Sequence, residues 1–319
     1  MWFNIAMNNH GPSEYYAALT PAINYTRAAL SKCGHEVTVG YDQLYPDAIN
    51  LYFEHFLGEP VAEMILGVKR AHSLRLGVIA TELMVGGTIP YARDGIFLPA
   101  NVAKDDNIAR RMEGFRSMAA GADFVWSFLE RTALDYSSVA RRCEFFPVGH
   151  VSAVPPELRR SPKDVDVVFF GARTPHRAAV LDSLAALGIG VTAVGRGFQG
   201  EWMDQSLLLS LLDRARIGLN LTLQSWDGQS GSIDPRFVSC MRVTEMLDRD
   251  LCVVSEDIPQ DNPYGPYMIS APPERIAATC RDILAAGNWA ELGRTRAAAF
   301  RHDMDVATLC PPIIERSIP

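Results

Sequence analysis

The sequence predicts an α/β protein built from two Rossmann-like domains that face each other across a cleft. In both halves of the chain, strand-like apolar runs alternate with helix-like segments, which is typical of doubly wound parallel sheets. The length of 319 residues exceeds the usual size of a single domain. A proline-rich stretch without periodicity, from Gly149 to Lys163, interrupts the alternation near the middle of the chain.

These observations predict four parts of the chain. An N-terminal domain covers 1–150, a linker covers 151–163, and a C-terminal domain covers 164–304. The remaining residues, 305–319, form a tail that could return to the N-terminal domain.

Six runs in the N-terminal half have the composition of buried strands. They are Trp2–Met7, Glu36–Val39, Ile49–Phe56, Leu76–Ala80, Asp123–Phe128 and Cys143–Pro147. Helical spacing predicts helices between them, over Tyr16–Ser31, Val61–Ser73, Lys104–Ala120 and Arg131–Arg141. The segment that contains Gly86, Gly87 and Pro90 is expected to be a loop, because glycine and proline interrupt regular structure.

The C-terminal half repeats the alternation. Its predicted strands are Asp164–Phe170, Val191–Val194, Ile217–Leu221, Leu251–Val254 and Tyr267–Ser270. Its predicted helices are Ala178–Leu187, Asp204–Arg214, a short helix that begins at Arg242, Pro273–Ala286 and Trp289–Asp303.

The composition is that of an ordinary soluble protein, with 48% hydrophobic and 21% charged residues. The formal net charge of -7 argues against a nucleic-acid groove or a polybasic membrane surface as the main function. Neither a signal peptide nor an apolar run long enough to cross a membrane is evident, so a cytoplasmic location is expected. The 6 cysteines are scattered, which predicts reduced core residues rather than zinc ligands or a disulfide framework.

One loop has the composition of an anion site. Gly171–Arg177 lies between a predicted strand and a predicted helix and contains Arg173, His176 and Arg177. A helix N-terminus offers free N–H groups and a partial positive charge, and guanidinium groups bind diphosphates bidentately. The alternative is that these arginines are solvated side chains at the start of a helix. The Gly195–Gly197 segment lacks the third glycine of a nicotinamide-binding loop, and metal-ligand spacing is not found.

Three carboxylate or imidazole side chains are further candidates. Glu245 presents two acceptor oxygens that suit paired sugar hydroxyls, and the alternative is a salt bridge to Arg242 or Arg249. Glu82 and His10 follow predicted strands, at the edge where parallel sheets bind ligands. Each is a candidate base, and a structural or solvated side chain is the alternative.

An ordered set of segments carries a resemblance to one family. The set comprises Asp164–Gly171 with Arg177, Arg216–Leu221, Arg242–Leu247 and Val253–Glu256, with weaker similarity in Thr81–Leu83, Ala122–Ser127 and Phe146–Gly149. In order and spacing these segments resemble bacterial GT-B glycosyltransferases of the CgeB-like and group-1 C-terminal-domain type.

The resemblance implies transfer of a sugar from a nucleotide-sugar donor to an unidentified acceptor, without a metal or another cofactor. It implies that the C-terminal domain holds the donor and the N-terminal domain holds the acceptor. The implied roles are ribose binding by Glu245, diphosphate binding near Gly171, Arg173 and Arg177 with help from Arg242, and closure of the donor pocket by Ser255 and Glu256.

The chain departs from the family pattern at one position of the donor site. Many group-1 enzymes have a second glutamate two helical turns before the ribose-binding one, and Phe237 stands there. This leaves two alternatives to a glycosyltransferase: a catalytically silent GT-B protein that binds a nucleotide or a protein partner, or another enzyme, such as a sugar epimerase, on the same architecture.

Overall fold

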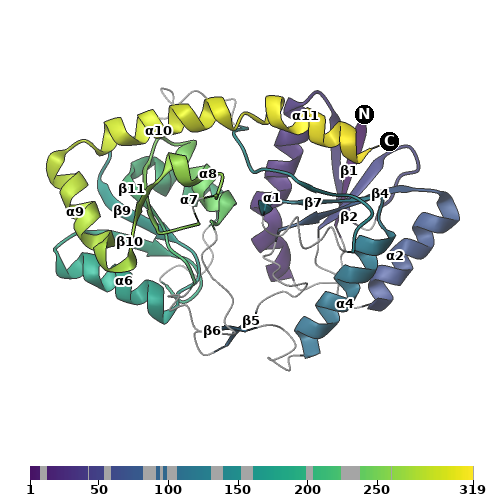
Figure 1. Cartoon of the computed structure of the whole chain (residues 1–319), viewed down its shortest axis with the longest axis horizontal. Helices are drawn as coiled ribbons and strands as arrows, with labels where there is room; N and C mark the ends of the chain where they lie inside the picture. The colour runs from purple at the N-terminus through teal and green to yellow at the C-terminus, as the bar shows by residue number, and fades with distance from the viewer. Residues whose placement is uncertain are drawn as a thin grey trace. The chain divides into compact units, whose positions relative to one another are not determined.

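The structure is a computed structural model that forms two compact units (Figure 1). It describes residues 1–7, 13–41, 43–53, 59–81, 91–93, 96–98, 106–130, 139–151, 161–198, 204–223, 238–259 and 261–318. The first unit comprises Met1–Arg93, Leu98–Val151 and Met304–Pro319, and the second comprises Asp94–Phe97 and Ser152–Asp303. Each unit is an α/β structure around a parallel sheet, which confirms the predicted α/β fold class with two parallel-sheet units.

The sheet of the first unit has six strands in the order β2-β1-β3-β4-β7-β8, all parallel. The strands are β1 Trp2–Met7, β2 Glu36–Tyr41, β3 Ile49–Phe53, β4 Arg75–Ala80, β7 Phe124–Ser127 and β8 Cys143–Phe145. Helices α1 Ser13–Lys32, α2 Glu59–His72 and α4 Asp106–Gly121 connect them. Two short strands, β5 Tyr91–Arg93 and β6 Ile96–Leu98, lie where the sequence predicted only a loop.

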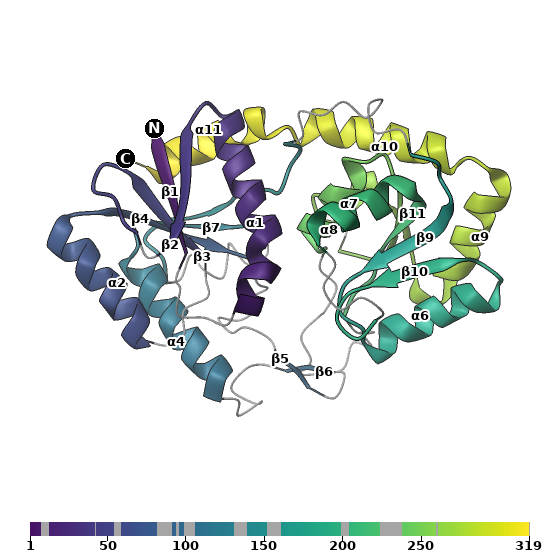
Figure 2. The same ribbon diagram turned by 180° about the vertical axis from the view of Figure 1, so that it is seen from behind.

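Both faces of this sheet are covered by helices (Figures 1 and 2). Helices α2 and α4 pack on one face, where Phe115 and Met118 are fully buried against the strands. On the opposite face the Trp126 indole stacks on Phe146, with ring centroids 4.6 Å apart. Strands β3 and β4 are buried on both sides, which explains why their sequences are nearly continuous apolar runs.

The last helix of the chain, α11 Val306–Ser317, belongs to the first unit. Its N-cap residue Asp305 accepts a hydrogen bond from the backbone N–H of Ala307 and forms an ion pair with Lys32 at 2.9 Å. At its other end, the buried Trp126 Nε1–H donates to Ser317 Oγ at 2.8 Å. The C-terminal helix therefore completes the face of the sheet that α1 covers only in part.

The second unit contains a five-stranded parallel sheet in the order β10-β9-β11-β12-β13. Its strands are β9 Val165–Phe170, β10 Val191–Val194, β11 Ala215–Asn220, β12 Cys252–Glu256 and β13 Ile269–Ala271. Its helices are α6 Pro175–Ala186, α7 Gln205–Arg214, α8 Cys240–Leu247, α9 Ile276–Ala286 and α10 Trp289–Asp303, with 3-10 turns at Gly265–Tyr267 and Pro273–Arg275. Helices α6 and α9 bury one face of the sheet, and α7, α8 and α10 lie on the other (Figures 1 and 2).

Several elements differ in detail from those predicted from the sequence. The strand predicted over Tyr267–Ser270 begins two residues later, because a 3-10 turn precedes it. Residues 305–319 were predicted as a tail without a helix, and most of them form α11 despite Pro311 and Pro312. Of the helix predicted over Arg131–Arg141, residues 131–138 lie outside the described part of the chain, and the residues from Val139 to Arg141 are not helical.

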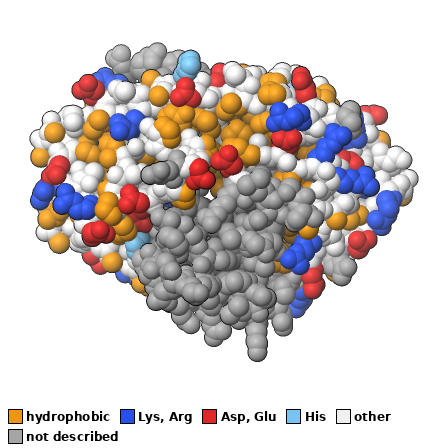
Figure 3. Space-filling model, viewed as in Figure 1, with side chains coloured by type: hydrophobic (Ala, Val, Ile, Leu, Met, Phe, Trp, Pro, Cys, Tyr) orange, Lys and Arg blue, Asp and Glu red, His pale blue; other side chains and the backbone are white. Residues whose placement is uncertain are grey.

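Acidic and basic side chains are interspersed over the described residues on the face drawn in Figure 3. All six cysteines are free, four of them buried and two, Cys33 and Cys143, partly accessible.

Within the described ranges, no helix is both long enough and apolar enough to span a membrane.

The junction between Gly149 and α11 allows a stability prediction. A Cβ atom at Gly149 would lie 2.1 Å from the backbone oxygen of Met304, and His150 pairs with Asp305 next to it. We therefore expect Gly149→Ala to destabilise the protein by about 3 kcal/mol, measured by urea unfolding. The control is Gly67→Ala in α2, where a Cβ meets nothing within 4 Å, and this change should stabilise by about 0.5–1 kcal/mol. Equal effects of the two substitutions would contradict the packing argument.

Candidate functional site

Polar residues gather at the carboxyl edge of the second sheet, where β9, β11 and β12 end side by side. Strand β9 runs into Gly171, β11 ends at Asn220, and β12 ends at Ser255 and Glu256. Parallel sheets bind ligands at this edge, because the strand-to-helix loops and the helix N-termini converge there. The structure thus brings together residues that are up to 85 positions apart along the chain, such as Gly171 and Glu256.

The loop from Gly171 to Thr174 joins β9 to α6 in a conformation that requires glycine. Gly171 has a φ angle of 149°, and a Cβ atom there would lie 2.8 Å from the Arg242 guanidinium. Thr174 caps α6 by accepting a hydrogen bond from the backbone N–H of Arg177, and Pro175 occupies the first turn. Close approach of backbone to guanidinium is the reason for glycine at position 171.

Arg177 is buried and holds the loops of the site together. Its Nε and Nη2 donate to the carbonyl oxygens of Thr222 and Leu221, both at 2.9 Å, and its Nη1 donates to the carbonyl oxygen of Ala172 at 2.8 Å. Burial lowers the pKa of Arg177 to about 10, against the attraction of Glu256. Arg177, predicted to lie near a diphosphate with a solvated side chain as the alternative, is therefore a buried cation that connects the β9 loop to the end of β11.

Arg242 on α8 is the second buried guanidinium of the site. It lies over the rings of Phe169 and Phe170, with distances of 5.3 Å and 5.6 Å to the ring centroids. Its Nη1 makes long contacts of 3.5 Å to Asn220 and Leu221, and its Nε has no hydrogen-bond partner within the described part of the chain. Burial and the positive charge of Arg177 lower the pKa of Arg242 to about 9, and Glu245 partly opposes this shift.

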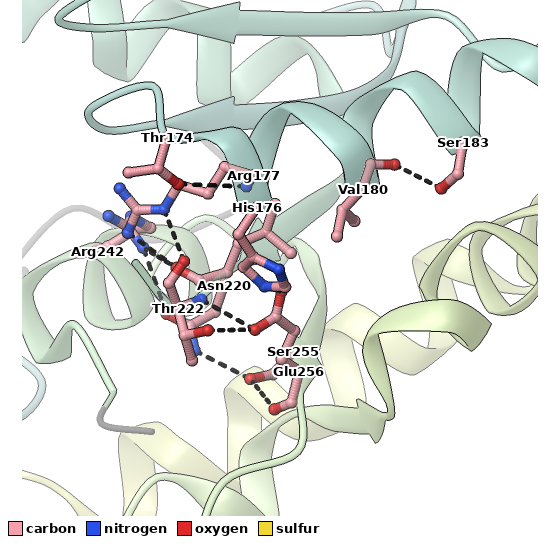
Figure 4. A network of polar contacts seen from close by, with 11 residues as sticks. Thr174, His176, Arg177, Val180, Ser183, Asn220, Thr222, Arg242, Ser255 and Glu256 are labelled. Atoms are coloured by element: carbon pink, nitrogen blue, oxygen red, sulfur yellow. Dashed lines mark hydrogen bonds and ion pairs between the residues drawn. The ribbon is translucent and has the colours of Figure 1, made fainter. Parts of the chain in front are cut away.

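A buried carboxylate organises the opposite side of the network (Figure 4). Glu256 Oε2 accepts hydrogen bonds from the hydroxyl and the backbone N–H of Thr222, at 2.5 Å and 3.2 Å, and Oε1 lies 2.7 Å from Nε2 of His176. Ser255 accepts a hydrogen bond from the amide of Asn220 and donates to the carbonyl oxygen of Glu256. Both oxygens of Glu256 are thus bonded to other residues of the protein, so this carboxylate holds the end of β12 to Thr222 and to His176 on α6.

Glu245 lies on the same helix as Arg242, and its hydrogen-bond partner is on a different helix, α7. It is half-buried, and its Oε1 accepts a hydrogen bond from Gln205 on α7 at 3.3 Å. Burial raises the pKa of Glu245, although Arg249, Gln205 and Arg242 act in the opposite direction. A carboxylate that is partly desolvated and bonded on one oxygen keeps acceptor capacity for another polar group.

The remaining predicted site residues do not join this network. Arg173 is exposed, and its backbone N–H donates to the carbonyl oxygen of Arg196 at 2.8 Å. The candidate bases Glu82 and His10, and the unusual Phe237, lie outside the described residues.

Sequence reasoning missed the residues that complete the site, namely His176, Asn220, Thr222 and the ring of Phe169. His176 was noted only as part of a basic loop. Asn220 follows an apolar run, so the signal was a polar residue at the end of a buried strand, the same pattern that marked Glu256. Phe169 gave no signal, because a phenylalanine in an apolar run is indistinguishable from ordinary core.

The site and the two sheets define an α/β protein of two parallel-sheet units with a polar site at the edge of the second sheet. No protein-family model and no curated protein sequence matches the chain. Solved structures do match over most of its length. OtsA in its apo form is 12% identical with a TM-score of 0.55, and the match covers 100% of this chain and 99% of that one.

Two further structures give the same result. T4 phage β-glucosyltransferase is 9% identical with a TM-score of 0.56, over 100% of this chain and 99% of that chain. The UDP-forming α,α-trehalose-phosphate synthase from Burkholderia vietnamiensis is 12% identical with a TM-score of 0.51, over 97% and 80%. These similarities identify the fold as GT-B, the fold of one class of glycosyltransferases, and so confirm the predicted fold.

Proposed function

We propose that this protein is a glycosyltransferase whose second unit binds a nucleotide-sugar donor. The observation that carries the proposal is the Arg242 guanidinium, which is buried over two phenylalanine rings and whose Nε is unpaired among the described residues. Such a group is costly in the absence of an anion and is well suited to a diphosphate. The GT-B fold supports a glycosyl donor as the source of that diphosphate.

The donor fits the site in three parts. The diphosphate would lie at the N-terminus of α6, near Gly171, where backbone N–H groups and the Arg242 charge converge. Arg177 would contribute its positive charge while its hydrogen bonds hold the loops in place. Glu245 would accept hydrogen bonds from the ribose hydroxyls, and Ser255 and Glu256 would form the wall of the pocket.

Catalysis in this proposal rests on stabilising the nucleoside diphosphate as it departs. Fixed guanidinium groups and helix N–H groups oppose the charge that develops on the leaving oxygen, which requires no metal ion. An inverting reaction also needs a base, for which Glu82 and His10 are the candidates, whereas a retaining reaction needs none. The sugar, most simply a hexose, would pass to an acceptor held by the first unit.

The finer assignments from the sequence belong to the same proposal. They are affiliation with the bacterial CgeB-like and group-1 enzymes, a cytoplasmic location, and the absence of a cofactor other than the nucleotide sugar itself. The ordered segments from Asp164 to Glu256 support the affiliation.

A thermal-shift panel of nucleoside diphosphates and their sugars tests the proposal. A ligand at 100 times its dissociation constant adds about 2.7 kcal/mol to the free energy of unfolding, so the matching nucleotide should raise Tm by several degrees. The nucleoside alone, which lacks the diphosphate, is the control and should have a much smaller effect. Sugar release from the matching donor would then support the enzyme. Stabilisation without any turnover would favour a silent nucleotide-binding protein, and no stabilisation by any nucleotide would contradict both.

A further inference from the structure

The first unit contains a pair of thiols that the proposed function does not use. Helix α1 ends at Lys32, and the next residue, Cys33, contacts the start of α11. The Cys33 Sγ lies 3.5 Å from the carbonyl oxygen of Val306. The ion pair between Lys32 and Asp305, at 2.9 Å, holds the same two segments together.

Cys310 lies one helical turn after Val306, which places it on the same face of α11. The side chains of Cys33 and Cys310 lie close enough for each to shift the pKa of the other. Cys310 is fully buried, whereas Cys33 is partly accessible. A reagent from solvent therefore reaches Cys33 first, and Cys310 is reached through Cys33.

The two thiols differ in reactivity. The neighbouring Cys310 side chain lowers the pKa of Cys33, and Lys32 acts in the same direction, although burial and Asp305 oppose the shift. The Cys33 side chain and burial raise the pKa of Cys310. The thiolate is the nucleophilic form of cysteine, so Cys33 is the attacking sulfur and Cys310 the resolving one.

The other cysteines lack this arrangement. Burial raises the pKa of Cys143 and Cys280 to about 12 and that of Cys252 to about 11. Cys252 and Cys280 lie close enough for one to affect the pKa of the other, yet both are buried. Cys33 differs from these thiols in having its pKa lowered while staying accessible.

We propose that Cys33 and Cys310 are an oxidation site, a dithiol that closes to a disulfide and fastens the C-terminal helix to α1. The oxidant is a small-molecule disulfide such as oxidised glutathione. The Cys33 thiolate attacks one of its sulfurs, which forms a mixed disulfide and releases one glutathione thiolate. Cys310 then attacks the Cys33 sulfur, loses its proton to solvent, and releases the second glutathione thiolate. The protein loses two electrons and two protons in total, and glutathione disulfide is reduced to two thiols.

The experiment uses the full chain treated with oxidised glutathione, followed by alkylation of the remaining thiols and peptide mass mapping. We expect one intramolecular crosslink between the peptides of Cys33 and Cys310, with four cysteines still alkylated. We also expect Tm to rise by about 5 °C, reversed by dithiothreitol, because the crosslink closes a long loop.

Variants separate this site from adventitious oxidation. Cys143→Ser removes the other partly accessible thiol and should leave both the crosslink and the rise in Tm unchanged. Cys33→Ser should abolish both, and Cys310→Ala should stop the reaction at a mixed disulfide on Cys33. A stable mixed disulfide on wild-type Cys33, a crosslink to any other cysteine, or no reaction at Cys33 would overturn the proposal. None of these results depends on whether the protein binds a nucleotide.

Discussion

Replacement of Arg242 by methionine is expected to weaken nucleoside diphosphate binding about 100-fold, since a charge-assisted hydrogen bond contributes up to about 3 kcal/mol. The ligand-free protein should be at least as stable as wild type, because methionine fills the space above Phe169 and Phe170 without burying a charge. A lower affinity for the nucleotide with an unchanged free energy of unfolding would indicate that Arg242 binds the ligand and does not stabilise the fold. Titration calorimetry and thermal unfolding of the same preparation measure the two quantities.

The matched control is Arg281→Met on the exposed surface of α9, where the arginine pairs with Asp282. That substitution removes the same charge from the chain and should change neither affinity nor Tm by much. If Arg242→Met binds the nucleotide as tightly as wild type, the diphosphate does not lie at Arg242. If it unfolds the protein, Arg242 stabilises the fold in the absence of a ligand, which its unpaired Nε argues against.

Replacement of Glu245 by alanine is expected to weaken nucleoside diphosphate binding about 30-fold and to remove selectivity for the ribose hydroxyls. Wild type should prefer a nucleoside diphosphate over its 2′,3′-dideoxy analogue, whereas Glu245→Ala should bind the two alike. This comparison isolates the contact between carboxylate and ribose, because the diphosphate is common to both ligands. Equal preference in wild type and variant would exclude Glu245 from the ribose site, and Glu274→Ala on the surface is the control.

The raised pKa of Glu245 also predicts how stability depends on pH. At about pH 3.5 the carboxyl is protonated in both the folded and the unfolded chain, so it carries no penalty. As the pH rises above the ordinary value, the unfolded chain ionises first, and the folded chain loses stability until the pH passes the raised pKa. Glu245→Gln should therefore be more stable than wild type at pH 7 and equally stable at about pH 3.5.

The alternation of strands and helices was sufficient to predict two parallel-sheet units. Each of the buried strands β3, β4, β9 and β12 is an apolar run that ends abruptly at a polar residue or a turn. Helix α11 was missed for a physical reason. Pro311 and Pro312 lack the N–H groups that an interior helical turn donates, so local preference opposes the helix. Tertiary contacts, such as the Trp126 hydrogen bond to Ser317, stabilise the helix nevertheless.

The candidate site was predicted in part, and the limit is again physical. Gly171 and Arg177 were named because they lie in a basic loop between a predicted strand and a predicted helix, and Arg242 and Glu256 were named through the family resemblance. Their roles depend on burial and partners, which a sequence does not contain. Arg177 binds three backbone carbonyl oxygens and Glu256 binds Thr222 and His176, whereas Arg242 keeps an unpaired nitrogen. Arg177 and Arg242, both predicted to bind the diphosphate, thus differ in the hydrogen-bond donors that they have left for a ligand.

The membership of α11 in the first unit affects the order in which the protein folds on the ribosome. Domains near the N-terminus usually fold first during synthesis. Here the first unit lacks α11 until the ribosome has made residues 306–317, whereas the second unit is continuous from Ser152 to Asp303 apart from Asp94–Phe97. Until then, Trp126 and the face of the sheet around it have no cover from α11. We therefore expect the second unit to become compact before α11 has been added to the first unit, which reverses the usual order.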